Sequence, residues 1–292
     1  MKLDVVYHTG RADKPACIFI HGLGVDKDIW SAPSKAKFFG GLLPLSMLVK
    51  EPKGMRTLYH DLLDIGYTVA TWSQSRPVGP MDIAVDELKA VIGLLKDIKT
   101  TGILLIGHSR GGLIARQYLD NLRQSDGTAI LITLSTPHHG STMARWAVYA
   151  SSLSNIVKPI IPGKEKGKVT KTLKKILDLL ESTAVKELLP DSPLLKSLKH
   201  TRHEGIYSVS AGGTNPTFIT IAGISILDSL GKLLKGRLPE EMTKGKGDGL
   251  VSLKSSILPF ADEHLSFCVN HAEMLVDRLV RETLFKRITA LG

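Results

Sequence analysis

Glycines surround one serine of the chain at a point where an apolar run gives way to a helical pattern. The segment is Gly107-His108-Ser109-Arg110-Gly111, after the β-rich run 102–106 and before the helical pattern 113–122. Glycines on both sides of a serine leave room for a sharp strand-to-helix turn that lifts the hydroxyl above the edge of a sheet. The string alone is weak, but this context indicates a nucleophilic serine.

A serine hydroxyl is a poor nucleophile and needs a base, normally a histidine held by a carboxylate. The chain has ten histidines. In folds with such a serine turn, the triad residues follow one another along the chain in the order serine, acid, histidine. This order leaves His264 or His271 as the base. His271 closes the apolar run 265–269, the last predicted strand, and ligands meet an open α/β sheet at the carboxyl ends of its strands. We therefore favour His271 and expect His264 to be exposed where that strand starts.

The acid of such a triad should lie between Ser109 and His271. Most acidic residues in this interval sit on lysine-rich, helix-like stretches. Asp248 differs, because it lies in the glycine-rich loop 245–249 that opens onto Leu250 and Val251. We favour Asp248, and Asp228 is the alternative.

Acyl transfer also requires donors for the developing oxyanion. The backbone N–H that follows the nucleophile belongs to Arg110. A second donor should come from the loop after an early strand, and His21-Gly22-Leu23 follows the apolar run 16–20 there. We predict the N–H of Leu23 as this donor.

The elements that position these residues alternate between strands and helices. Strands are expected at 1–7, 16–20, 67–72, 102–106, 129–134, 205–209 and 265–269, and helices at 55–65, 83–98 and 113–122. A last helix should begin near Ala272, with Val276, Leu279, Val280 and Leu284 on one face. This alternation predicts an α/β fold with a mainly parallel sheet. The rhythm stops at 145–203, so we predict a helical insertion there between core segments 1–144 and 204–292.

Composition excludes several classes of protein. The 292 residues include 43% hydrophobic and 23% charged residues, and a chain of this length can bury a core without disulfides or metals. The net charge is +10, with ten lysines against five acids from Lys158 to Lys199, but aromatic residues make up only 5%. Without a recognition motif, we expect no nucleic-acid partner. Cys17 and Cys268 both lie in apolar runs and are expected to be buried free thiols.

Two expectations concern membranes and compartment. No apolar run approaches about 18 residues, so no transmembrane segment is expected. The first seven residues lack the long apolar run of a signal peptide, so we expect a cytoplasmic or an already processed secreted chain.

The chain resembles the α/β-hydrolase superfamily and, within it, the bacterial lipases and esterases. The resemblance lies in His21-Gly22-Leu23-Gly24, in Gly107–Gly111, in Ser135–Ser141, and in Gly247–Val251 together with Asn270-His271. It implies an α/β-hydrolase fold with a helical cap or lid at 145–203 over an acyl pocket. It also implies the triad Ser109, Asp248 and His271, with Leu23 and Arg110 at the oxyanion hole. The implied function is hydrolysis of acyl esters of medium to long chain through an acyl-enzyme; a small-ester esterase, a thioesterase or an acyltransferase is the alternative.

The sequence departs from these relatives in places. Arg110 stands where many carry Gln or Met, which predicts a more basic mouth of the site. We expect no cofactor or metal; structural calcium held by Glu273 and Asp228 is the weaker alternative, and His138-His139 is interpreted as a turn rather than a zinc site. Segments 40–41 and 43–45 are further candidates for the border of the pocket.

One helix of the insertion could contact lipid. Leu173, Ile176, Leu177 and Leu180 fall at helical spacing beside Lys171, Lys174 and Lys175. A cationic amphipathic helix suits reversible docking on a negatively charged lipid interface. The alternative is that the leucines pack on the core and the lysines are solvated.

Overall fold

A computed structural model gives the fold of the chain. It describes residues 3–38, 40–41, 43–122, 127–145, 178–179, 181–217, 220–221, 224–225 and 239–291.

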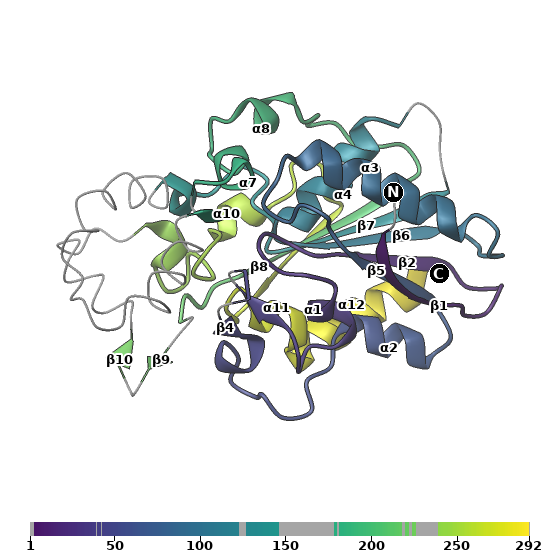
Figure 1. Ribbon diagram of the computed structural model, residues 1–292, viewed down its shortest axis with the longest axis horizontal. Coiled ribbons are helices and arrows are strands. Elements are labelled where there is room, and N and C mark those ends of the chain that lie inside the picture. Colours follow the sequence, from purple (N-terminus) through teal and green to yellow (C-terminus); the bar gives the residue numbers. More distant parts are fainter. Residues whose placement is uncertain are drawn as a thin grey trace.

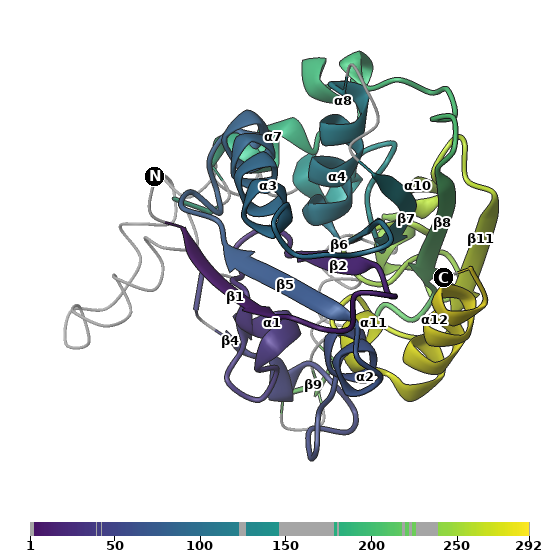
Figure 2. The same ribbon diagram turned by 90° about the vertical axis from the view of Figure 1, so that its right-hand side faces the viewer.

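A seven-stranded sheet forms the centre of the molecule (Figures 1 and 2). Its strands are β1 (Asp4–His8), β2 (Ala16–Ile20), β5 (Thr68–Ser73), β6 (Ile103–His108), β7 (Thr128–Leu134), β8 (Tyr207–Gly213) and β11 (Glu263–Phe267). They lie in the order β1-β5-β2-β6-β7-β8-β11, and all neighbours are parallel except β1 and β5. The predicted mainly parallel sheet is confirmed.

Helices cover both faces of this sheet, as the turned view shows (Figure 2). One face carries α3 (Met81–Leu95) and α4 (Arg110–Asp120), and the other carries α1 (Asp28–Ser31), α2 (Leu58–Asp64), α11 (Glu273–Val276) and α12 (Arg278–Leu291). The short helices α7 (Thr183–Glu187), α8 (Pro193–Ser197) and α10 (Leu253–Ser256) lie toward the carboxyl ends of the strands or beside α3 and α4. Two small antiparallel pairs lie outside this sheet: β3 (Lys37–Phe38) with β4 (Leu43–Pro44), and β9 (Thr220–Ile221) with β10 (Ile224–Ser225). There are also two single 3₁₀ turns, η1 (Leu45–Met47) and η3 (Glu240–Met242).

Successive side chains of a strand point to opposite faces of the sheet, so each central strand contributes to the apolar core on both faces. In β2, Cys17 and Phe19 pack into the core beneath α2 and α12, whereas Ala16, Ile18 and Ile20 pack into the core beneath α3 and α4. A strand buried on both faces reads as a continuous apolar run, and this is why β2 could be located in the sequence.

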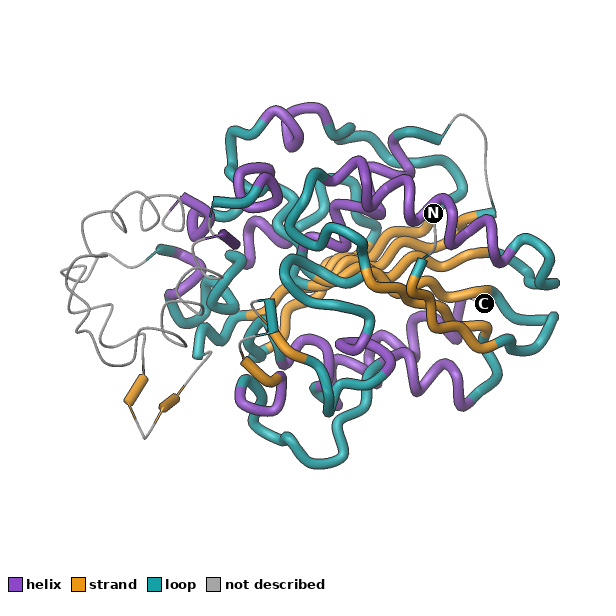
Figure 3. The backbone as a smooth tube through the Cα atoms, viewed as in Figure 1, coloured by secondary structure: helices purple, strands orange, loops and turns teal. Residues whose placement is uncertain are grey.

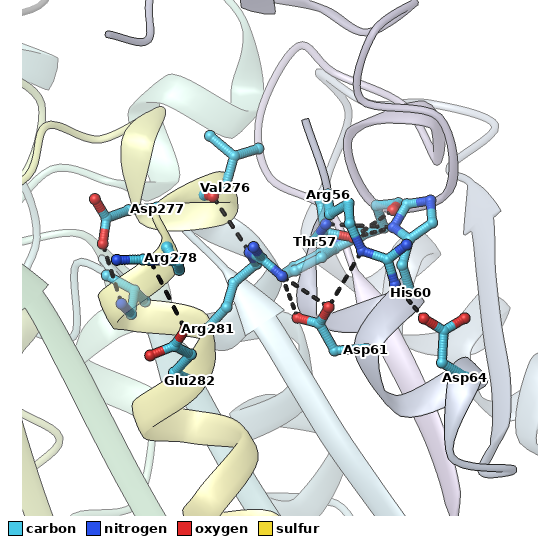
Figure 4. Close-up of polar contacts among 12 residues, drawn as sticks. Arg56, Thr57, His60, Asp61, Asp64, Val276, Asp277, Arg278, Arg281 and Glu282 are labelled. Carbon is cyan, nitrogen blue, oxygen red and sulfur yellow. Dashed lines mark hydrogen bonds and ion pairs between the residues drawn. The ribbon is translucent and has the colours of Figure 1, made fainter. Parts of the chain in front are cut away.

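Ion pairs tie the last helix to α2 (Figure 4). Arg281 donates from one nitrogen to both carboxylate oxygens of Asp61, at 2.7 and 2.5 Å, and Arg56 contacts the same carboxylate at 3.4 Å. Val280, Leu284 and Ile288 of α12 are buried in the same core as α2, and the pair of Arg281 with Asp61 adds a polar contact between the two helices.

Most strands and helices lie within three residues of their predicted bounds, but β8 spans Tyr207–Gly213 instead of 205–209, and further differences occur near the end of the chain. β11 begins and ends two residues earlier than expected, so His264 lies inside it rather than at its start. The last helical segment is divided at Asp277, and Leu279 is 64% exposed instead of sharing the buried face of Val280 and Leu284.

Cys268 is exposed, and the prediction that both thiols are buried is wrong for this residue. β11 is one of the two edge strands, and Phe267 and Val269 on either side of Cys268 point into the core. By alternation Cys268 points away from that core. Cys17 is fully buried in the centre of the sheet, as predicted.

The predicted insertion lies mostly outside the described residues. The amphipathic segment around Lys171–Leu177 and Leu180 falls outside the described residues, and so does the alternative acid Asp228 in the second core segment. Within the part of the chain that the structure describes, no helix is both long enough and apolar enough to cross a membrane. The tube view separates the described elements, in colour, from the rest of the chain (Figure 3).

Candidate active site

The site lies at the carboxyl ends of the parallel strands, where the order of the sheet changes direction. The chain passes from β2 to β5 on one side of β2 and then to β6 on its other side. The helix α2, which follows β2, and the helix α4, which follows β6, cover opposite faces of the sheet. Loops that leave β2 and β6 therefore diverge, as expected at the ligand-binding crevice of an open α/β sheet.

Ser109 occupies a strained turn between β6 and α4. Its φ of 56° and ψ of −128° are rare for a residue with a side chain. The turn requires glycine on both sides, because a Cβ at Gly107 would lie 2.4 Å from the Gly112 nitrogen and one at Gly111 would lie 2.3 Å from the Ile20 oxygen. This geometry is the one that the sequence pattern predicted for a nucleophile.

The loop after β2 passes directly against this serine. A Cβ at Gly22 would lie 2.8 Å from the Ser109 Cβ and 3.3 Å from its Oγ, so only glycine fits there. Leu23 follows, and Arg110 is the first residue of α4, where helical N–H groups have no acceptor within the helix. Both predicted oxyanion donors therefore belong to segments beside the hydroxyl.

The segment at 40–45 lies next to the same loop. The N–H of Gly40 donates to the carbonyl of Gly24 at 2.8 Å, whereas Leu45 is fully buried in the core. Leu43 is half-buried in β4. A role of this segment at the border of a pocket stays a prediction.

Asp248 and His271 are in direct contact. The Nδ1 of His271 lies 2.8 Å from Oδ2 of Asp248, and both side chains are at most 2% exposed. The other carboxylate oxygen accepts from the N–H groups of Leu250 and Val251 at 3.0 and 2.8 Å. Burial acts to raise the pKa of Asp248, but the electrostatic attraction and hydrogen bond of the His271 imidazole, together with Ser135 and the Leu250 N–H, outweigh burial, so the pKa is lowered. The acid is held ionised beside the imidazole.

His108 links the serine turn to the histidine loop. Its Nε2 lies 2.9 Å from the carbonyl oxygen of His271, and the two imidazole rings are 4.6 Å apart. Burial, together with the nearby His271, lowers the pKa of His108 to about 3. The ring is neutral near pH 7. Because His108 directly precedes Ser109, its bond to the His271 carbonyl holds the His271 backbone beside the serine turn.

His264 is placed away from this contact. It lies inside β11, partly buried, with Nδ1 2.8 Å from the Ser210 hydroxyl. The expectation of an exposed histidine at the strand start is wrong, because the strand begins earlier.

The Arg110 side chain does not face solvent. The prediction of a basic mouth is wrong, because the residue is fully buried and its guanidinium pairs with Glu187 at 3.2 Å. Burial lowers the pKa of Arg110, and Glu187 opposes that effect.

Two of the candidate metal ligands, Glu273 and His138, contact protein groups. Glu273 accepts from the N–H groups of Lys50 and Asn270 at 3.2 and 3.0 Å. His138 is buried with Nε2 3.0 Å from the Thr133 hydroxyl. Among the residues that the structure describes, no group of three histidine, cysteine, aspartate or glutamate side chains is arranged to hold a metal ion.

Sequence reasoning missed a neighbour of the acid. Ser135 has a φ of 47°, is fully buried after β7, and lowers the pKa of Asp248 through its hydroxyl. Its segment was noted for its resemblance to lipases, but no spacing in the chain connects it with Asp248. Both residues lie against β8, because the N–H of Ser135 donates to the Ala211 carbonyl at 2.7 Å and a Cβ at Gly213 would lie 2.7 Å from the Asp248 Cβ.

A mainly parallel sheet with a serine turn at its switch point defines an α/β-hydrolase. The family model described as palmitoyl protein thioesterase matches residues 16–176, more than half of the chain. The chain belongs to this family, within the esterase, lipase and thioesterase type of α/β-hydrolase.

Solved structures have the same fold at low sequence identity. Bacillus licheniformis lipase BlEst2 in its propeptide form superposes with a TM-score of 0.61 and 19% identity over 98% of this chain and 53% of that one. The mature form gives 0.55 and 17% over 97% of both chains. A soluble variant of monoglyceride lipase from Saccharomyces cerevisiae gives 0.52 and 12% over 99% of this chain and 90% of that one.

This chain thus spans about half the length of the propeptide form of the lipase. At these identities the likeness shows the fold alone. No curated protein matches the sequence.

Proposed function

We propose that the protein hydrolyses carboxylic acyl esters through an acyl-enzyme on Ser109. The observation that carries the proposal is the 2.8 Å contact between His271 and Asp248 beside the strained serine turn. A buried carboxylate that holds Nδ1 leaves Nε2 as the base for the serine hydroxyl.

The reaction proceeds in two steps. Oγ of Ser109 attacks the ester carbonyl while His271 takes its proton, and the N–H groups of Leu23 and Arg110 stabilise the oxyanion. The carbon–oxygen bond to the alcohol breaks, and the imidazolium gives its proton to the leaving oxygen. His271 then takes a proton from a water molecule, which attacks the acyl carbonyl. The bond between the acyl carbon and Oγ of Ser109 breaks, the carboxylic acid leaves, and His271 returns the proton to Oγ.

Medium to long acyl chains are the substrates that we favour among oxygen esters. A panel of p-nitrophenyl esters from acetate to palmitate tests this, with Ser109→Ala as the inactive control. The proposal expects the highest kcat/KM at octanoate or beyond. A maximum at acetate, followed by a steady fall, contradicts it and favours a small-ester esterase.

A thioesterase is the second candidate, and the family match favours it. The same triad can attack a thioester, because the developing oxyanion is the same. Palmitoyl-CoA and a palmitate oxygen ester of similar solubility should be compared at equal concentration. A kcat/KM for the thioester at least tenfold higher would assign the protein to thioesters, and an equal or lower value would leave it with oxygen esters.

Docking on a lipid interface is proposed from the amphipathic segment that contains Leu177. Leu177→Asp should spare turnover of a short soluble ester and depress turnover of an emulsified long-chain ester, and salt should reduce adsorption to anionic vesicles. Leu194→Asp, on α8, is the control for a general loss of packing. Equal loss on both substrates, or adsorption that ignores salt, would show that the helix is structural.

A further inference from the structure

The peptide that carries the Leu23 N–H is oriented by a side chain. In a trans peptide the C=O and the N–H point in opposite directions, so fixing the Gly22 oxygen also fixes the Leu23 N–H. The Nδ1 of His21 lies 3.0 Å from that oxygen. His21 is therefore placed to aim one of the two proposed oxyanion donors.

The role of His21 depends on which ring nitrogen carries the proton. The backbone N–H of Gln74 donates to Nε2 of His21 at 3.0 Å, so Nε2 is an acceptor and Nδ1 bears the hydrogen. Burial lowers the pKa of His21 to about 4, and the ring is neutral near pH 7. The neutral Nδ1–H form is the one that can donate to the Gly22 oxygen.

Gln74 is held in turn by the residue that supplies the other donor. Its side-chain nitrogen donates to the His21 carbonyl at 2.8 Å, and its Oε1 accepts from Nη1 of Arg110 at 3.3 Å. Arg110 offers its backbone N–H to the oxyanion and its side chain to Gln74. Both proposed donors thus belong to one hydrogen-bonded network.

The charge of Arg110 is balanced from α7. Its Nη2 donates to the Gly79 carbonyl at 2.6 Å and to Glu187 Oε2 at 3.2 Å. Glu187 Oε1 accepts from the N–H of Met81 at 3.0 Å. A fully buried guanidinium requires such partners, because an unpaired buried charge is strongly destabilising. Arg110 and Glu187 thereby join the serine turn to α3 and α7.

We propose that Arg110, Gln74 and His21 form a positioning relay that sets the direction of the Leu23 N–H in the oxyanion hole. The inference rests on the proposed acyl-enzyme function, because the relay matters only where an oxyanion forms between these donors. The three side chains act through the Gly22–Leu23 peptide and do not touch the substrate, although the backbone N–H of Arg110 is itself the other proposed oxyanion donor.

The relay predicts an effect on kcat that is separate from stability. Gln74→Leu breaks the relay and leaves the Arg110–Glu187 pair intact, so kcat should fall by about tenfold to a hundredfold with KM within about twofold. Glu187→Gln leaves Arg110 in contact with Gln74 but removes its counter-charge. Glu187→Gln should lower the melting temperature more than Gln74→Leu does, and it should lower kcat less.

A double variant separates the two effects further. Arg110→Met leaves Glu187 without its partner and breaks the relay, so both stability and kcat fall. Arg110→Met combined with Glu187→Gln removes both charges and should regain melting temperature but not kcat. Arg145→Met is the matched control, since Arg145 forms an exposed ion pair with Asp191 at 2.9 Å outside the relay.

Inhibition by an alkylboronic acid tests the geometry directly, because its tetrahedral adduct with the serine resembles the transition state. Its inhibition constant should rise in Gln74→Leu and Arg110→Met by the same factor by which kcat/KM falls. Wild-type kcat and inhibition in both variants, measured where they are folded, would overturn the relay. A kcat that follows melting temperature across all variants would also overturn it.

Two measurements separate this proposal from the proposed function. Nitrogen-15 NMR of histidine-labelled protein should find His21 neutral with its proton on Nδ1, and a proton on Nε2 overturns the relay whether or not the enzyme is active. A fluorophosphonate should label Ser109 in the wild-type protein. Absence of that label means that the proposed function has failed, and the catalytic role of the relay fails with it.

Discussion

His271 and Asp248 are joined twice. The Nδ1 of His271 lies 2.8 Å from the Asp248 carboxylate, and the backbone N–H of His271 donates to the Asp248 carbonyl at 3.0 Å. The second bond ties the two loops together, so the imidazole is fixed in position as well as in tautomer. A histidine that is held in this way can accept a proton without first having to rotate.

Asp248→Asn tests the charge of this pair. Asparagine keeps the shape but cannot stabilise an imidazolium, and kcat on a soluble ester should fall by about 10³- to 10⁴-fold. Asp191→Asn, which removes an exposed carboxylate, is the control. A loss below tenfold in Asp248→Asn would assign the acid elsewhere, with Asp228 as the alternative.

His271→Ala and His264→Ala should differ by several orders of magnitude in kcat. Of these two histidines, His271 is held by a buried carboxylate, whereas His264, in the edge strand β11, bonds to the Ser210 hydroxyl. Steady-state kinetics of the two variants measures the difference. If His264→Ala proved the more damaging variant, the base would have been assigned wrongly.

The two thiols should react at different rates. Cys268 is exposed, and Cys17 is fully buried with its pKa raised by burial. A colorimetric disulfide reagent should modify one thiol per chain in the folded protein and the second only after unfolding, because the thiolate is the reactive form. Cys268→Ala should remove the fast phase. Persistence of that phase in the variant would mean that Cys17 becomes accessible in the folded state.

Stability should fall as the pH is lowered from about 6.5 toward 4. Burial lowers the pKa of His21 to about 4 and that of His108 to about 3. Between about pH 6.5 and 4 both histidines therefore bind a proton in the unfolded chain and remain mostly neutral in the folded protein. Each such histidine contributes a slope of about 1.4 kcal/mol per pH unit to the free energy of unfolding. Stability above pH 6.5 is unaffected by these groups.

Urea unfolding at several pH values measures this slope. His108→Gln should reduce it, whereas His200→Gln, at an exposed position, should leave it unchanged. An identical slope in wild-type protein and His108→Gln would mean that His108 already carries a proton when folded.

Most of the sheet could be predicted because its strands are buried on both faces. The apolar runs around Phe19, Leu105 and Leu131 correspond to β2, β6 and β7. The edge strand β11 was misplaced by two residues, because it is only half covered and its sequence, Glu-His-Leu-Ser-Phe, is mixed. The same partial cover explains the wrong prediction for Cys268.

The candidate site could be predicted only as far as chain order and strand ends allow. The turn at Ser109 depends on local glycines, and the positions of Asp248 and His271 follow from loops at strand ends. The direction of the Arg110 side chain depends on Gln74 and Glu187, which come from distant segments. Contacts of that kind leave no periodic signal in the sequence.

Mass spectrometry of the trapped acyl-enzyme is the most direct test of the central claim. Wild-type protein mixed with p-nitrophenyl octanoate and quenched in acid within milliseconds should gain the mass of one octanoyl group, and peptide mapping should place it on Ser109. Ser109→Ala should gain none, and His271→Ala should acylate orders of magnitude more slowly. An octanoyl group on another residue, or ester turnover by Ser109→Ala at the wild-type rate, would contradict the account.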